Sequence, residues 1–129
     1  MNKDLIELQQ NVKAISVIVK TEECKQLSPT LAFPADVSDK FLFADAKPPF
    51  ADKIDEKSKK AGDGICYLVI TDIDQIDIKQ QNRYISLVKN RVINNYHLPD
   101  NCIIVFTVKN KTAIKKMSPD LYDLTILAL

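Results

Sequence analysis

Three aspartates within residues 71–77 (TDIDQID) are the side chains in this sequence best placed for chemistry. Asp72, Asp74 and Asp77 follow the apolar stretch 65–70, which predicts a buried strand. Carboxylates gathered at the end of a strand can bind Mg²⁺, whose preferred ligands are oxygen atoms. The same residues also suit a solvated turn in which Asp77 caps a following helix. The second interpretation is preferred because no further ligand is in view, so no metal site is predicted. A magnesium-dependent enzyme or switch is kept as an alternative.

The other residue types that serve catalysis give no activated nucleophile. His97 is the only histidine, and the sequence places no serine or cysteine in a recognisable triad with it. The three cysteines, Cys24, Cys66 and Cys102, show no CxxC spacing. Cys66 and Cys102 lie in apolar segments, so we expect buried, reduced thiols, as in a cytoplasmic protein. No catalytic residue and no cofactor is predicted.

A run of lysines near the C-terminus is a candidate interaction surface. Lys109, Lys111, Lys115 and Lys116 are not opposed by an acidic residue before Asp120. The whole chain carries 18 basic and 17 acidic side chains, a net charge of +1, so nucleic acid is not an expected partner. The apolar runs are too short to cross a bilayer, and the N-terminus does not resemble a signal peptide. A membrane is therefore not expected as a partner either.

The apolar pattern predicts strands and helices that alternate within one domain, residues 1–129. Strands are predicted at residues 14–19, 65–70, 102–108 and 125–129, and helices at 4–10, 48–61, 77–95 and 120–124. The longest helix is expected to bury Gln81, Ile85, Val88 and Val92. Residues 25–47 are expected to form a long connection with a hairpin. The fold class is α/β, a small, mainly parallel sheet with helices on both sides, in which strands 65–70 and 102–108 are neighbours.

Several short motifs follow one another in a particular order after Gly64. They are Thr71 and Asp72 at a strand end, then Gln81 with Asn82, Leu98-Pro99-Asp100, Lys109 with Asn110, and Ser118-Pro119 with Leu121. This order resembles that of AAA+ ATPases of the MoxR type. In that family these motifs are the Walker B pair, a Gln-Asn on the next helix, a Leu-Pro-Asp/Glu turn, the sensor asparagine and a Ser-Pro-x-Leu helix. The resemblance covers about residues 28–125 and implies a trimmed P-loop NTPase-like core.

The resemblance also implies that the catalytic positions are substituted. The family's magnesium-binding aspartate falls on Thr71, and the glutamate that positions the attacking water falls on Asp72. The two form a degenerate Walker B-like pair. The sensor position falls on Lys109 or Asn110. The arginine that follows Ser-Pro-x-Leu falls on Leu124.

A phosphate-binding loop is not found in the sequence, because no glycine precedes Gly62. Such a loop uses glycines to turn backbone N–H groups inward, followed by Lys and Ser/Thr at a helix start. Two arrangements of the chain are consistent with the missing loop. If residues 14–19 form the strand after the nucleotide-gripping helix, the chain begins beyond the loop. If they form the first strand, Thr21, Glu22, Glu23 and Cys24 replace the loop. Nucleotide binding is not expected in either case.

These observations predict a non-catalytic, AAA+-like binding or regulatory module, a pseudo-ATPase that docks on a full-length ATPase or on a second copy. A decayed ATPase fragment is a further alternative. In the first arrangement residues 14–19 would form an apolar open edge. Because natural sheets rarely leave such an edge bare, a protein partner or a homo-oligomer is expected.

Overall fold

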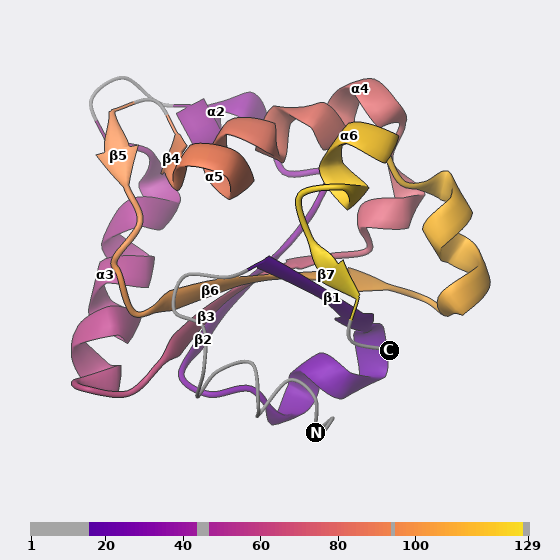
Figure 1. The fold of residues 1–129 in the computed structure, drawn as a ribbon. Helices are drawn as coiled ribbons and strands as arrows, with labels where there is room; N and C mark the ends of the chain where they lie inside the picture. Colours follow the sequence, from indigo (N-terminus) through magenta and orange to yellow (C-terminus); the bar gives the residue numbers. More distant parts are fainter. Residues whose placement is uncertain (1–15, 44–46, 94, 128–129) are drawn as a thin grey trace.

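A parallel sheet forms the centre of the molecule. The computed structural model describes residues 16–43, 47–93 and 95–127. Five strands lie in the order β2-β3-β6-β1-β7, and all of their pairings are parallel (Figure 1). The strands are β1 (Ser16–Lys20), β2 (Thr30–Pro34), β3 (Cys66–Thr71), β6 (Cys102–Val108) and β7 (Ile126–Leu127). The α/β class and the parallel sheet predicted from the sequence are confirmed.

The three central strands form where the sequence is continuously apolar. β3 and β6 are neighbours, with their register running from Cys66 opposite Cys102 to Ile70 opposite Phe106. Their side chains alternate between two buried clusters, one on each face of the sheet. A strand that is covered on both faces has no polar side, which is why its signal is a short apolar run. The predictions for β1, β3, β6 and the closing strand β7 are confirmed in kind, with small shifts of their ends.

The predicted hairpin in residues 25–47 is wrong, because this segment supplies the edge strand β2 and the short helix α2 (Asp39–Phe43). Among the described residues β2 pairs with β3 alone, so its other side is an edge of the sheet that they form. Phe33 is buried at this edge, with its ring 5.1 Å from that of Phe41 and 5.9 Å from that of Phe50. These contacts join three separate elements, so no local pattern indicates the strand.

The helix predicted after the double proline is confirmed as α3 (Pro49–Ala61). Pro49 stands at its first position, where a missing N–H costs nothing. Phe50 and Ile54 are fully buried. Gly62 ends the helix with φ of 59°, a left-handed value that suits glycine.

The single long helix predicted for residues 77–95 is wrong. The structure has α4 (Ile78–Gln81), a 3₁₀ turn η3 (Asn82–Tyr84) and α5 (Ile85–Asn90), which ends at left-handed Arg91. A hairpin of β4 (Val92–Ile93) and β5 (Tyr96–His97) follows. A 3₁₀ turn has fewer residues per turn than an α-helix, so it rotates the buried face. The core therefore receives Gln81, Tyr84 and Leu87, while Ile85 and Val88 are only partly buried and Val92 lies in the hairpin.

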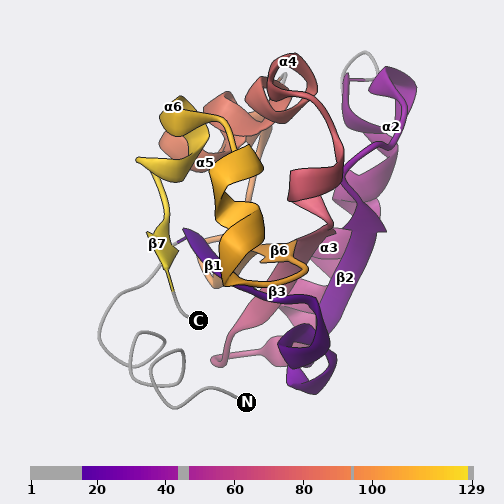
Figure 2. The ribbon, with the colours of Figure 1, turned by 90° about the vertical axis from the view of Figure 1, so that its right-hand side faces the viewer.

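The helices are distributed unevenly over the two faces of the sheet. α2 to α6, with α6 spanning Pro119–Tyr122, pack with η2 (Ile73–Gln75) and η4 (Lys111–Lys116) on one face. Among the described residues the other face is covered by η1 (Thr21–Gln26) and the loop after it (Figures 1 and 2). The connection from β1 to β2 runs across the sheet in the opposite direction to the others. Right-handed crossovers therefore place it on the opposite face. Helices flank the sheet on both sides, as expected, although among the described residues the second side carries only the 3₁₀ helix η1.

β1 lies inside the sheet, so the expectation of an open apolar edge at residues 14–19 is wrong. β1 pairs with β6 along its whole length and with β7 at Val17 and Ile18. The argument for self-association through this strand therefore fails. The predicted helix at residues 4–10 lies outside the described residues. In the described part of the chain, no helix has the length and apolar character needed to cross a membrane.

A polar cluster joins α3 to the β4–β5 hairpin. The Tyr96 hydroxyl donates to Asp55 Oδ1 at 2.6 Å, and Lys47 Nζ lies 2.9 Å from Asp55 Oδ2. Burial raises the pKa of Asp55, but the hydrogen bonds from Tyr96 and Lys47 outweigh it and hold this pKa below the ordinary 3.8. A carboxyl whose pKa is depressed in the folded state stabilises the fold above its ordinary pKa. This contribution is lost as the pH falls through the folded-state pKa.

Replacing Tyr96 by phenylalanine is expected to lower the free energy of unfolding by about 1 kcal/mol near neutral pH. The loss should be smaller at pH ~3, which lies below the ordinary pKa of 3.8, because the stability that the depressed pKa of Asp55 contributes is lost progressively below that value. Urea unfolding of both proteins at the two pH values measures this. Tyr122→Phe is the matched control, since its hydroxyl bonds to no other described side chain or backbone group. A loss that does not change with pH would show that Asp55 is not the partner that matters.

Candidate functional site

The carboxyl ends of β1, β3 and β6 meet at one edge of the sheet. In open α/β sheets, ligands bind outside these ends where neighbouring strands send their connections to opposite faces. β1 and β6 are such neighbours, because η1 follows β1 on one face and η4 follows β6 on the other. The fold itself therefore marks this edge as the place to look for a ligand site.

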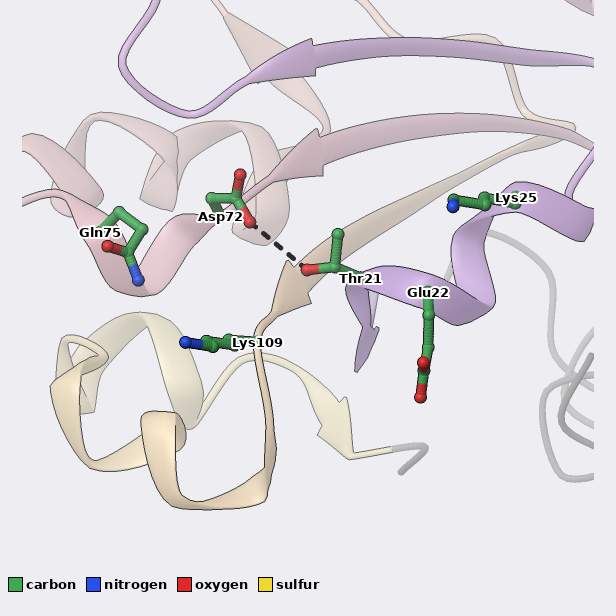
Figure 3. A pocket seen from close by; sticks show the side chains of 6 residues that line it. All are labelled: Thr21, Glu22, Lys25, Asp72, Gln75 and Lys109. Carbon is green, nitrogen blue, oxygen red and sulfur yellow. Dashed lines mark hydrogen bonds between the residues drawn. The ribbon is translucent and has the colours of Figure 1, made fainter.

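An open pocket of about 570 Å³ lies at this edge (Figure 3). Its lining comes from the segments that directly follow the three strands: Thr21, Glu22, Lys25, Asp72, Gln75 and Lys109. A second hollow of about 160 Å³ shares Asp72 and Gln75 and continues to the end of β2. The two hollows follow the carboxyl edge across the sheet.

A small network of hydrogen bonds ties the strand ends together beneath the pocket. Thr107 is fully buried, and its Oγ1 accepts a hydrogen bond of 2.9 Å from the backbone N–H of Asp72. The Thr21 hydroxyl lies 3.2 Å from both Thr107 Oγ1 and the Val108 carbonyl oxygen, and 3.3 Å from Asp72 Oδ1. It can donate its single hydrogen to any one of these acceptors. The last residues of β6 and the first residues after β1 and β3 are therefore held in a fixed relation.

Asp72 has an unusual backbone conformation for a residue other than glycine. Its φ of 58° and ψ of 45° are left-handed. Aspartate adopts this region more readily than most residues, but it still costs free energy. The bond from Asp72 N–H to Thr107 helps to hold it. Such conformations cluster at functional sites, where the surrounding structure over-determines them. The effect here is to place an exposed carboxylate at the mouth of the pocket.

Four of the lining residues are charged, two of each sign. The ion pairs among described residues are those of Lys47 and Arg83, so the pocket charges are not paired with one another. Figure 3 shows Lys25 and Lys109 on different sides of the Asp72–Thr21 pair, while Glu22 points away from Asp72. None of the six lining residues is aromatic. The arrangement is suited to a small, polar, charged molecule.

The predicted Walker B-like pair lies at this edge. Thr71 ends β3 and lines the smaller hollow, and Asp72 lines both. The other two aspartates do not join it. Asp74 is buried and accepts a bond of 2.8 Å from Gln75 Nε2, while its second oxygen has no partner. Asp77 caps α4 by accepting from Gln80 N–H at 2.8 Å, as the turn interpretation predicts.

The alternative magnesium site is not assembled by these three residues. Within residues 16–43, 47–93 and 95–127, no group of three or more His, Cys, Asp or Glu could hold a metal ion. The candidate triad of Asp72, Asp74 and Asp77 is thus divided between a pocket, a buried contact and a helix cap.

The residues predicted as sensor-like or as an interaction surface lie in different places. Asn110 is exposed and caps η4, with its Oδ1 accepting from Ala113 N–H at 3.0 Å. Lys109 lines the pocket instead. The remaining lysines of the candidate surface, Lys111, Lys115 and Lys116, are exposed on η4.

Lys25 and Gln75 are pocket residues that the sequence did not single out. Each lies within a few residues of the end of a parallel strand, and this position is the signal that could have found them. The burial expected for the cysteines is confirmed for the two that lie in strands. Cys66 and Cys102 are buried, whereas Cys24 is half-buried, and burial raises its pKa.

The Gln81-Asn82 and Ser118-Pro119 motifs, on which the family resemblance partly rests, contact each other away from the pocket. Gln81 is fully buried, and its Nε2 donates to the carbonyl oxygens of Ile76 at 3.0 Å and Lys116 at 2.8 Å. Its Oε1 accepts from the Ser118 backbone N–H. The Ser118 hydroxyl donates to Asn82 Oδ1. In this protein these residues therefore join α4 to α6 and have a packing role.

The sequence matches no family model, and comparison with curated proteins and with solved structures likewise yields no match. The interpretation of the pocket therefore depends on its geometry.

Proposed function

We propose that the protein is a non-catalytic binding module with an AAA+-like core, which does not bind or hydrolyse nucleoside triphosphates. One observation carries this proposal. The segment directly after β1, η1, is a 3₁₀ helix without glycine that has Glu22 and Glu23 in its first turn. This segment lies beside Asp72 and Lys109, at the edge where a phosphate-binding loop would be needed.

The position of β1 favours one of the two arrangements considered from the sequence. β1 lies between β6 and β7, and Thr21 contacts the ends of β3 and β6. This supports β1 as the first strand of the core, with Thr21 to Cys24 in place of the loop. Phosphate binding at such a place depends on several backbone N–H groups turned towards the ligand. Here the backbone is wound into a 3₁₀ helix, and two carboxylates would repel phosphate.

The neighbouring positions support the same conclusion. Thr71 offers no carboxylate for a magnesium ion, and Asp72 Oδ1 lies 3.3 Å from the Thr21 hydroxyl. Leu124, which falls at the arginine position implied by the resemblance, is 38% exposed and uncharged. What this edge retains is an open polar pocket with unpaired charges, and that favours binding over catalysis.

We expect no saturable heat when ATP or GTP is titrated with Mg²⁺ into the protein to about 1 mM, since the free energy from phosphate contacts is missing. The double variant Glu22→Gln with Glu23→Gln separates two causes. If charge repulsion alone prevents binding, the variant should bind; if the missing loop is the cause, it should not. We expect no binding by either protein. A dissociation constant of about 1–10 μM for the natural sequence, near −8 kcal/mol, would refute the proposal.

A further inference from the structure

We propose that the pocket at the carboxyl edge binds a small zwitterion of the α-amino acid type, and binds acidic amino acids most tightly. This assignment rests on the proposed binding function and names the ligand of the same pocket. Three features carry it: the signs of the charges, the way in which Asp72 is held, and the absence of aromatic side chains from the lining.

The charges around the pocket require a ligand that carries both signs. Lys25 and Lys109 come from different elements, after β1 and β6, and lie on different sides of the Asp72–Thr21 pair in Figure 3. None of the three forms an ion pair with another described residue. A simple anion would use the two ammonium groups but would be repelled by Asp72. A simple cation would use Asp72 but would be repelled by both lysines. An amino acid offers an ammonium group to Asp72 and a carboxylate to a lysine.

The second lysine indicates the preferred side chain. With one ammonium group bound to the α-carboxylate of the ligand, the other remains available for a second anionic group. Glu22 points away from Asp72, so it does not occupy this position. The pocket of about 570 Å³ has room for a dicarboxylic amino acid. Gln75 and Thr21 can donate to a carboxylate of the ligand or accept from its ammonium group.

Asp72 is prepared for this role before any ligand arrives. Its left-handed backbone is held by the bond of 2.9 Å from its N–H to the buried Thr107 hydroxyl. Its carboxylate is exposed, and its only hydrogen-bond partner among described residues is the Thr21 hydroxyl at 3.3 Å. That distance is long for a hydroxyl donor, so an ammonium group can displace or supplement it at little cost.

The lining also argues against other small ligands. A nucleobase gains much of its binding from stacking on aromatic side chains, and this pocket has none. An oligophosphate would place several negative charges near Asp72 and Glu22. Because the pocket is open and its charged groups remain in contact with water, we expect a dissociation constant of about 0.1–5 mM.

The test compares two ligands that differ in one group. Glutamate and glutarate are both dicarboxylates, but only glutamate carries the α-ammonium group. Each is titrated into the protein to about 20 mM at constant ionic strength, and amide chemical shifts are followed by NMR. We expect saturable shifts at the amides around Thr21, Asp72 and Lys109, with glutamate bound at least about tenfold more tightly than glutarate.

Charge-neutralising variants then show which protein side chain binds the ammonium group of the ligand and which binds its carboxylates. Asp72→Asn should remove the preference for glutamate over glutarate, and asparagine tolerates the left-handed backbone. Lys109→Gln should weaken both ligands by about threefold or more. Lys60→Gln and Asp63→Asn, exposed residues at the end of α3 and just after it, are matched controls that should change nothing.

Equal affinity for glutamate and glutarate in the natural protein would overturn the assignment, because Asp72 would then not recognise the ammonium group. The same conclusion follows if glutamate produces no saturable shift. The comparison of the two ligands uses the natural sequence, so it does not depend on the folding of a variant. Failure here leaves the proposed lack of nucleotide binding untouched, since that is measured with a different ligand and by calorimetry.

Discussion

Replacing Val69 by aspartate is expected to unfold the protein. Val69 lies in the middle of β3, paired with Ala32 on one side and Val105 on the other, and its side chain is fully buried. It belongs to the apolar cluster between the sheet and η1. A carboxylate at this position would have no partner, and its burial would cost several kcal/mol. Domains of this size are stable by only about 5–15 kcal/mol, so most of that margin is lost.

The neighbouring strand offers a control at the same level of the sheet. Ala32 is the register partner of Val69 but is exposed on the edge strand β2. Ala32→Asp introduces the same charge and should cost less than about 1 kcal/mol. Val69→Ala should lower stability by about 1–3 kcal/mol and leave a folded protein. Circular dichroism during urea unfolding measures all three, and a cooperative transition for Val69→Asp close to that of Ala32→Asp would contradict the burial of β3.

The predictions that succeeded were those that depend on local sequence. β1, β3 and β6 are buried on both faces, so each is a short apolar run that can be recognised without knowing its neighbours. The same holds for α3, whose start and end are marked by Pro49 and Gly62. β2 was missed because an edge strand that ends at Pro34 has a weak local signal. Its burial depends on Phe33 meeting rings from α2 and α3.

The site could be predicted only in part for the same physical reason. Asp72 and Lys109 were identified because they directly follow strands that the sequence shows clearly. Lys25 joins them only because β1 lies beside β6, and this strand order is a long-range property. Gln75 follows β3 through the turn η2, which has no clear signal in the sequence. The spacing of apolar residues likewise does not reveal that η3 rotates the buried face of this segment. As a result, the sequence predicted that Val92 is a core residue, whereas the core residues of this segment include Tyr84 and Leu87.

The Gln81–Ser118 contact shows how a family resemblance can rest on packing and not on catalysis. Gln81 and Ser118 belong to two different motifs of the resemblance, yet they meet in the interior. Asn82 and the Ser118 hydroxyl form a second bond beside them. If these residues serve only to join α4 to α6, their presence carries no information about nucleotide chemistry. The prediction that follows from this is one of stability.

Replacing Gln81 by leucine is expected to lower the free energy of unfolding by about 3–5 kcal/mol. Leucine has a similar volume but cannot form hydrogen bonds. The partly buried carbonyl oxygens of Ile76 and Lys116 and the buried N–H of Ser118 would each lose a partner. An unsatisfied buried group costs about 1–3 kcal/mol, and the surroundings can relax to recover part of that. Urea unfolding should show a lower midpoint with an unchanged slope.

Gln80→Leu is the matched control, because Gln80 is the exposed neighbour and takes part in hydrogen bonds only through its backbone. It should change stability by less than about 0.5 kcal/mol. Equal stability of the Gln81→Leu variant and the natural protein would show that the fold does not depend on this contact. The Gln-Asn and Ser-Pro motifs would then need a functional explanation, and the case for a catalytic core would be reopened. A large loss confined to Gln81→Leu would instead explain both motifs through the joining of α4 to α6, and leave the pocket beside Asp72 as the part of this edge that serves function.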